Sequence, residues 1–337
     1  MALPNLWGLY NLRSSPYFQA TLRSDTEATP LNLFVSRERE RHLLLTTIGS
    51  GRSSRQAVAG RPGIGKTTLV QAVKADAQEA GYWTSSEIIS LGSESSSEDL
   101  LGRLLSGAYD AVLASFPAAS GPALEAAQQL VRSFRLRGGG FSASAFGFGA
   151  GGTQTEGVST PPSALVLDGP RVLRDLLAYA LARGAQGLVL HLNNLENLSE
   201  ADANRAADLL RSVRDQALLL DGLHLMVVGT TDAVRTVVQT HTQIRSVFSD
   251  PQVLQPLALE DVEQLLANRY AALQLSPGQP WRAPVEDAVV AALSALSRGS
   301  ARNAQGPRGR HDGFAGSDQC WNQRWRRACR HGRPAFG

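Results

Sequence analysis

Eight consecutive residues have types and spacing that can do chemistry together: Gly60-Arg61-Pro62-Gly63-Ile64-Gly65-Lys66-Thr67. The glycines let the backbone turn sharply and aim successive N–H groups at one polyphosphate. The lysine can reach the β- and γ-phosphates, and the threonine hydroxyl can bind Mg²⁺. Thr68 follows directly, in the first turn of the helix that such a loop requires. The pattern predicts a phosphate-binding loop, with Lys66 as its charged group and Thr67 as its metal-facing group.

A phosphate-binding loop has to be held between a strand and a helix. Residues 55–59 read as a short strand before it, and Thr67 to Gly81 read as a helix after it. Lysine is rare here, because the 33 basic residues include only Lys66 and Lys74, which leaves 31 arginines. A glycine turn with an incidental lysine is the alternative. The strand–loop–helix context favours a nucleotide site.

Strand and helix patterns alternate along most of the chain. Residues 33–40 lead into an expected helix that ends near Gly49, and further helices are expected at 98–116, 122–136, 170–183 and 200–219. Further strands are expected at 82–89, 187–192 and 223–229. This alternation predicts an α/β fold, with a parallel sheet covered by helices on both faces.

The chain is long enough for about two domains. We expect an irregular segment at 1–32, interrupted by prolines, and the α/β core at 33–256. A glycine-rich insertion at 138–160 is read as a mobile linker or as a hairpin that contacts a partner or substrate. From residue 257 to 302 only helical patterns follow, at 260–272 and 284–297. This region is expected to form a small, truncated helical lid.

Mg²⁺ bound with a nucleotide usually needs an acidic residue at the end of a buried strand. The strand at 188–192 is followed by Asn193 and Asn194, which carry no charge and cannot act as a base. Asn193 can still hold a metal-bound water, and Glu196 is the nearest carboxylate. In the alternative register, residues 165–168 form the strand and Asp168 faces the metal.

Several short segments, in this order, resemble those of the AAA+ ATPases, in particular the origin-recognition-like and related bacterial initiator or signalling group. The segments are Phe34–Arg37, the phosphate loop, Asn193-Asn194, Val227–Thr231, Gln243–Phe248, Val253–Leu257 and Arg298–Arg302. Ser36 stands where that family usually has glycine. The resemblance spans about residues 33–302, and the phosphate loop is its most specific part.

The resemblance implies ATP and Mg²⁺ as cofactors and assigns further residues. Phe34 and Val35 would contact the adenine, and Thr230 would lie beside the γ-phosphate. Arg245 would be an arginine finger shared with a neighbouring subunit, so a homo-oligomer or partner protein is implied. Arg302 would reach the γ-phosphate from the lid. The implied function is an ATPase that couples nucleotide binding and hydrolysis to conformational change or assembly.

Other interpretations of the same residues stay open. A switch that scarcely hydrolyses ATP, or a DNA-associated initiator or transposition helper, would have the same core. In the alternative interpretation, Thr230 caps a helix and Arg245 lies on the surface. Glu196 is then an exposed residue of a first helical turn. His191, on an apolar strand, is expected to be a buried structural residue.

The basic charge is concentrated in the last residues. Residues 302–337 hold eight arginines and two aspartates (+6), so the other residues sum to −3 against a total of +3. The segment 303–337 is read as a basic arm for nucleic acid, as a zinc site using Cys320 and Cys329, or as translation in a shifted frame. Neither a signal peptide nor a membrane span is evident, so a cytoplasmic protein is expected.

Overall fold

The computed structural model describes residues 5–17, 34, 36–86, 88–92, 95–137, 162–193, 195, 200–276 and 278–303. The chain forms two compact units, Met1–Asp287 and Ala288–Gly337. Several sequence predictions fall outside the described residues. These are the insertion at 138–160, the tail from residue 304, Val35, Asn194 and Glu196.

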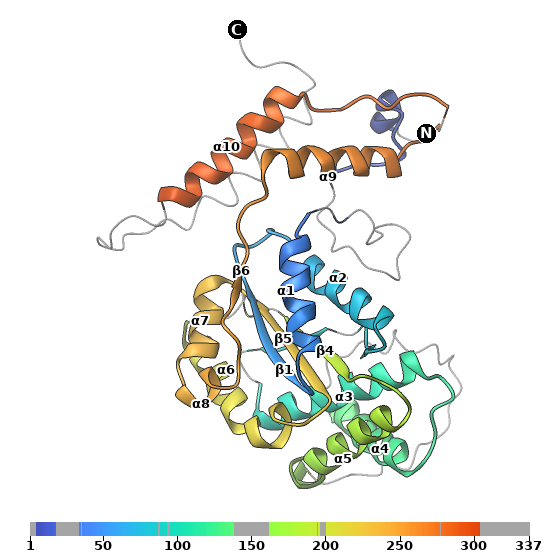
Figure 1. Ribbon diagram of the computed structural model, residues 1–337, viewed down its shortest axis with the longest axis vertical. Coiled ribbons are helices and arrows are strands. Elements are labelled where there is room, and N and C mark those ends of the chain that lie inside the picture. The colour runs from blue at the N-terminus through green and yellow to red at the C-terminus, as the bar shows by residue number, and fades with distance from the viewer. Residues whose placement is uncertain are drawn as a thin grey trace. The chain divides into compact units, whose positions relative to one another are not determined.

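A parallel sheet forms the centre of the first unit (Figure 1). Its strands run in the order β2 (Trp83–Thr84), β4 (Leu188–Asn193), β5 (Leu223–Gly229), β1 (Ser54–Ala59) and β6 (Gln252–Val253), and β3 (Ile89–Ser90) also pairs with β4. Every residue of β1, β4 and β5 is buried, as expected for strands covered on both faces. The prediction of a parallel α/β fold is confirmed.

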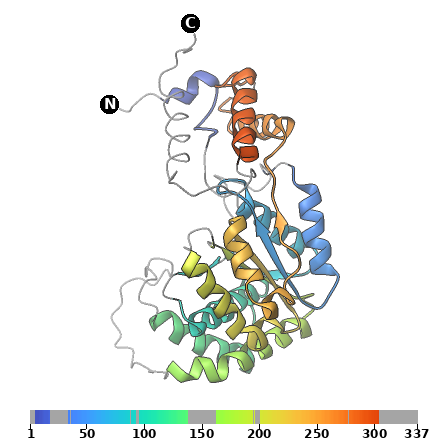
Figure 2. The same ribbon diagram turned by 90° about the vertical axis from the view of Figure 1, so that its left-hand side faces the viewer.

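Helices cover both faces of the sheet, as Figure 2 shows from the side. The first face carries α1 (Glu38–Gly49) and α2 (Lys66–Glu79). The second carries α3 (Ser97–Ser115), α6 (Glu200–Ser212), α7 (Thr231–Gln239) and α8 (Thr242–Arg245), and α4 (Pro122–Arg137) and α5 (Pro162–Ala182) pack on α3. Alternate strand residues serve the two faces: Val189 packs toward α2, whereas Leu188 and Leu190 pack toward α3.

The single strand expected at 82–89 is wrong, because the chain makes two short strands instead. Trp83 and Thr84 pair with β4, and Ile89 and Ser90 return to it further along. Between them, the carbonyl of Ser85 accepts a hydrogen bond from the Lys74 ammonium of α2. This carbonyl thus accepts a hydrogen bond from a helix side chain, and the strand is interrupted at this point.

The expectation that a helix begins at Pro170 is also wrong, since α5 begins at Pro162 and contains Pro170. Apolar residues at helical spacing continue across the proline and are buried against α3 and α4: Leu165, Val172, Leu173, Leu176 and Leu177. The proline leaves the carbonyl of Val166 without its usual N–H partner. Val166 is exposed, so water can satisfy this carbonyl.

The alternative that places a metal-facing Asp168 at the end of a strand fails for the same reason. Residues 165–168 lie in α5, and the Asp168 side chain is exposed. It forms an ion pair with Arg171 at 3.3 Å, one turn further along the same helix. Asp168 is thus a surface residue, and the strand with Asn193 is the one that belongs to the sheet.

Within the N-terminal segment expected to be irregular, residues 5–17 are described and contact a helix that is far away in the sequence. Residues Leu6–Tyr10 form a short 3₁₀ helix, and Leu12 is fully buried. The Asn11 amide donates to the carbonyls of Ser276 (3.1 Å) and Gln279 (2.7 Å), just beyond α9 (Leu259–Ala272). We call residues 5–17 and 259–282 together the α9 module. Its two parts are far apart in sequence, so no local pattern predicts it.

The remaining elements follow the sequence closely. The helix expected at 200–219 is α6 followed by a π-helical turn, Arg214–Leu218. The helix α10 runs from Asp287 to Asn303, and all of it except Asp287 belongs to the second unit. No helix in the described part of the chain is long and apolar enough to cross a membrane.

Candidate nucleotide-binding site

The predicted phosphate loop joins β1 to α2, as the sequence requires. Gly63 and Gly65 have φ angles of 76° and 93°, which only glycine adopts without strain. At Gly60, an added Cβ would lie 3.1 Å from Ile64 and 3.4 Å from Leu254. The glycines therefore allow both the turn of the loop and its close approach to the segment after β6.

Lys66 is the first residue of α2 and is only 4% exposed. Its ammonium donates to the carbonyl of Arg61 at 2.9 Å, so the lysine side chain folds back across the loop. A buried ammonium is costly unless it is paired with an acceptor or an anion. Its position places a positive charge beside the backbone of the loop.

The start of α2 supplies further donors at the same place. The first N–H groups of a helix have no partner inside it, and the helix dipole makes this end positive. In α2 these are the N–H groups of Lys66, Thr67 and Thr68. Thr67 and Thr68 are partly exposed, so an anion and its metal can reach them. Phe34 and Ile64 both pack against the core beside α2, which is where the adenine contact is expected.

Asn193 ends β4 with its side-chain oxygen buried and without a hydrogen-bond partner. The register aligns Leu192 with Val227, and Gly229 with Ala59, so the ends of β4, β5 and β1 lie at one edge of the sheet. With β5 between them, the ends of β4 and β1 are about 10 Å apart. An unpartnered buried oxygen at this edge fits a water bound to Mg²⁺, with Thr67 as the direct ligand.

Gly229, the last residue of β5, sets how closely the segment after β4 can approach. An added Cβ at Gly229 would lie 2.6 Å from the Cβ of Leu195 and 3.2 Å from Val234. Leu195 is fully buried and follows Asn193 by two residues. The absent side chain at Gly229 thus lets Leu195 pack on β5, and this packing holds Asn193 in place.

Gly229→Ala is therefore expected to destabilise the protein by about 1–3 kcal/mol, because the backbone at Leu195 must move. It should also weaken Mg²⁺-dependent nucleotide binding through Asn193. Urea unfolding and a nucleotide titration measure the two effects. Gly49→Ala at the end of α1, where nothing lies within 4 Å, is the matched control. Equal stability of the two variants would contradict the packing argument.

The structure places the remaining predicted residues at different locations. The Thr230 hydroxyl accepts from the N–H of Ala233 at 3.2 Å and caps α7, so its contact with a γ-phosphate stays a prediction. Arg245 is exposed at the end of α8, a position open to a neighbouring subunit. Arg302 lies in the last turn of α10, in the second unit, and its role also stays a prediction.

Two buried histidines carry strongly lowered pKa values. Burial first, and the charge of Lys74 second, lower the pKa of His191 to about 3. Burial first, and the charge of Arg55 second, lower the pKa of His224 to about 4. His191 is thus a neutral, buried residue, as the sequence predicted. Among the described residues, no group of three His, Cys, Asp or Glu side chains could hold a metal ion.

Sequence reasoning assigned no contact to two buried cations, Lys74 and Arg37. Lys74 reaches from α2 to the carbonyl of Ser85, after β2. The sequence signal that could have pointed to Lys74 is that lysine is rare in this chain. Arg37 contacts the loop itself, and nothing in its local sequence pattern indicates this.

The chain was compared with protein families and with solved structures. The AAA ATPase domain family matches residues 33–228, which is more than half of the chain. Structures of the Aeropyrum pernix ORC2 protein are also similar. Its ADP form has a TM-score of 0.42 and 16% identity over 83% of this chain and 59% of that one. Its ADPNP–ADP complexes have a TM-score of 0.39 and 15% identity over 71% and 53%.

The chain thus spans 53–59% of the length of those structures. No curated protein matches it. The family match includes the phosphate loop, α2, β4 and nearly all of β5, which are the elements that build the site. The chain therefore belongs to the AAA ATPase domain family.

Proposed function

We propose that this protein binds ATP with Mg²⁺ at residues 60–68 and couples binding and hydrolysis to a change of conformation or assembly. The observation that carries the proposal is the buried Lys66 ammonium, held at 2.9 Å from the Arg61 carbonyl within the loop. On binding, this lysine would exchange the Arg61 carbonyl for the nucleotide's phosphates. Family membership supports the choice of ATP.

The residues of the chain have separate tasks in this proposal. The N–H groups of the loop and of Thr67 and Thr68 hold the phosphates, and Lys66 neutralises their charge. Thr67 and Asn193 orient the metal and its water, while bound Mg²⁺ supplies charge stabilisation to phosphoryl transfer. Arg245 is exposed, which suits a contact with the nucleotide of a neighbouring subunit.

A second candidate function is a nucleotide switch that scarcely hydrolyses ATP. Asn193 favours it, because its buried side chain is neutral and cannot polarise the attacking water. The nearest carboxylate in the sequence, Glu196, lies outside the described residues. Both candidates require the same nucleotide binding and differ only in turnover.

A turnover assay with purified protein separates the two candidates. We expect the wild-type protein to hydrolyse ATP faster than Lys66→Ala, and turnover equal to that variant would establish the switch. Asn193→Asp adds a charge to the ligand set and should raise Mg²⁺ affinity by on the order of tenfold. Unchanged Mg²⁺ affinity in Asn193→Asp would show that Asn193 does not face the metal. If no nucleotide binds the wild-type protein, both candidate functions are wrong.

A further inference from the structure

We propose that Arg37 is a positioning residue that links the phosphate loop to the segment leading into the α9 module, so that the loop and this segment respond together to nucleotide. The inference rests on the proposed function. It goes further by naming the contact through which nucleotide binding reaches the α9 module.

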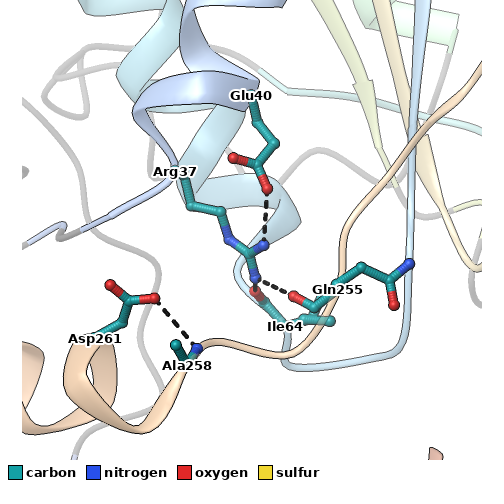
Figure 3. A network of polar contacts seen from close by, with 6 residues as sticks. All are labelled: Arg37, Glu40, Ile64, Gln255, Ala258 and Asp261. Carbon is teal, nitrogen blue, oxygen red and sulfur yellow. Dashed lines mark hydrogen bonds and ion pairs between the residues drawn. The ribbon is translucent and has the colours of Figure 1, made fainter.

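One guanidinium group contacts three separate parts of the fold (Figure 3). Its Nη1 atom donates to Glu40 of α1 at 3.1 Å. Its Nη2 atom donates to the carbonyl of Gln255, after β6, at 2.7 Å and to the carbonyl of Ile64, in the phosphate loop, at 3.4 Å. Arg37 is only 7% exposed, so these contacts are shielded from water.

The contact with Ile64 can sense phosphate through one rigid peptide unit. A trans peptide holds its C=O and the next N–H in one plane, pointing to opposite sides. The Ile64 carbonyl points to Arg37, so the N–H of Gly65 points away from it. Gly65 is one of the loop residues whose N–H groups are expected to bind phosphate. A phosphate that reorients this N–H must also reorient the carbonyl that Arg37 contacts.

The contact with Gln255 transmits such a change to the α9 module. Gln255 lies between β6 and Ala258, whose N–H is capped by Asp261 of α9 at 3.2 Å (Figure 3). The preceding residue, Leu254, bonds to Ala59 of β1 at 2.8 Å. The short stretch 255–258 is therefore the connection between the sheet and α9, and Arg37 holds its first residue.

The other connection of the α9 module leads to the same place. The N-terminal part of the module ends at residue 17, and the next described residues of the chain are Phe34, Ser36 and Arg37. The chain therefore rejoins the described core at residues next to the phosphate loop, and Arg37 is one of them.

The local backbone indicates that this arrangement is specifically maintained. Ser36 and Arg37 have φ angles of 67° and 77°, which side-chain-bearing residues adopt at a cost. Arg41, one turn later, forms a bidentate ion pair with Asp76 of α2 at 2.7 and 3.1 Å. Since α1 is fixed to α2 in this way, Arg37 is held at a set distance from the loop.

Lysine cannot replace this arginine. The guanidinium presents several N–H donors in one plane, whereas an ammonium is a point charge on a flexible stem. Arg37→Lys would keep the positive charge near Glu40 but would not span the carbonyls of Ile64 and Gln255 together. The lysine variant therefore separates the role of the positive charge from the role of the planar guanidinium group with its several N–H donors.

Hydrogen exchange of the full-length chain, with and without MgATP, tests the proposal. In the wild-type protein, MgATP should slow exchange at residues 60–70 and also change exchange at 254–262 by about fivefold or more. In Arg37→Ala and Arg37→Lys, the response at 60–70 should remain, while that at 254–262 should fall below about twofold. Arg39→Ala, an exposed arginine on the first turn of α1, should behave as wild type.

Each result has one meaning. A folded Arg37 variant that keeps the full response at 254–262 overturns the proposal. A wild-type response confined to 60–70 also overturns it and leaves the proposed function intact. If MgATP gives the wild-type protein no protection at 60–70, the proposed function fails and the link through Arg37 fails with it. If Arg37→Ala does not fold, as judged by circular dichroism, Arg37→Lys decides the outcome.

Discussion

Lys66→Ala is expected to lose ATP binding while the protein stays folded. In the wild-type protein, a ligand at 100 times its Kd adds about 2.7 kcal/mol to the free energy of unfolding. For a domain of this size, that corresponds to a rise in Tm of about 5–10 °C. Without the ammonium, the phosphates lose their charge partner, so MgATP should leave the Tm of the variant unchanged.

The nucleotide-free proteins provide the control for this result. The ammonium of Lys66 is buried, and the neutral carbonyl of Arg61 is one of its partners. Removing a buried charge also removes the cost of burying it, which offsets the contacts that are lost. Lys66→Ala should therefore unfold within about 1 kcal/mol of the wild-type protein when no ligand is present. A variant that still gains stability from MgATP would contradict the assignment of Lys66.

Acid should destabilise the protein between pH 6.5 and pH 4, and His224 accounts for a defined part of the loss. Its folded-state pKa of about 4 lies below the value of 6.5 for an unperturbed histidine. Within this window the unfolded chain binds the proton and the folded one does not, so stability falls as the pH falls. The loss reaches on the order of 3 kcal/mol by pH 4.

His224→Asn removes this titration and keeps a side chain that can bond the Ser54 hydroxyl, which lies 2.9 Å from Nδ1. The variant should be less stable at pH 7.5, because the ring packs against Gly187 and Tyr82. Between pH 4.5 and 6 its stability should depend less on pH, by about 1 kcal/mol per pH unit. Urea unfolding at several pH values measures this slope. An unchanged slope would contradict the buried, neutral state of His224.

Sequence patterns predict an element well where a single local signal decides it. The strand 223–229 and the helices at 98–116 and 122–136 follow from apolar spacing, and the structure has them within one or two residues. Local sequence signals give wrong element boundaries where a contact with a distant part of the chain determines them. Pro170 looks like the start of a helix, yet burial of Leu165 against α3 and α4 extends α5 to Pro162.

In the candidate site, too, some residues can be predicted from the sequence and others cannot. Its phosphate loop is evident from the sequence, since glycine and lysine at fixed spacing are needed wherever a backbone encloses phosphate. The choice between Asp168 and Asn193 could not be made from their types, because aspartate is the better ligand for magnesium. The tertiary structure distinguishes the two residues, because β4 brings Asn193 to the edge of the sheet and α5 leaves Asp168 exposed.

The sequence by itself determined the nucleotide-binding loop and the parallel α/β core, because both depend on residues that are neighbours in the chain. The tertiary structure alone decided what surrounds the loop. Arg37 reaches Ile64 and Gln255, which are 27 and 218 residues away, and Asn11 reaches Ser276 across 265 residues. Such contacts form only after the chain has folded, because burial brings the side chain of one segment to the backbone carbonyls of another.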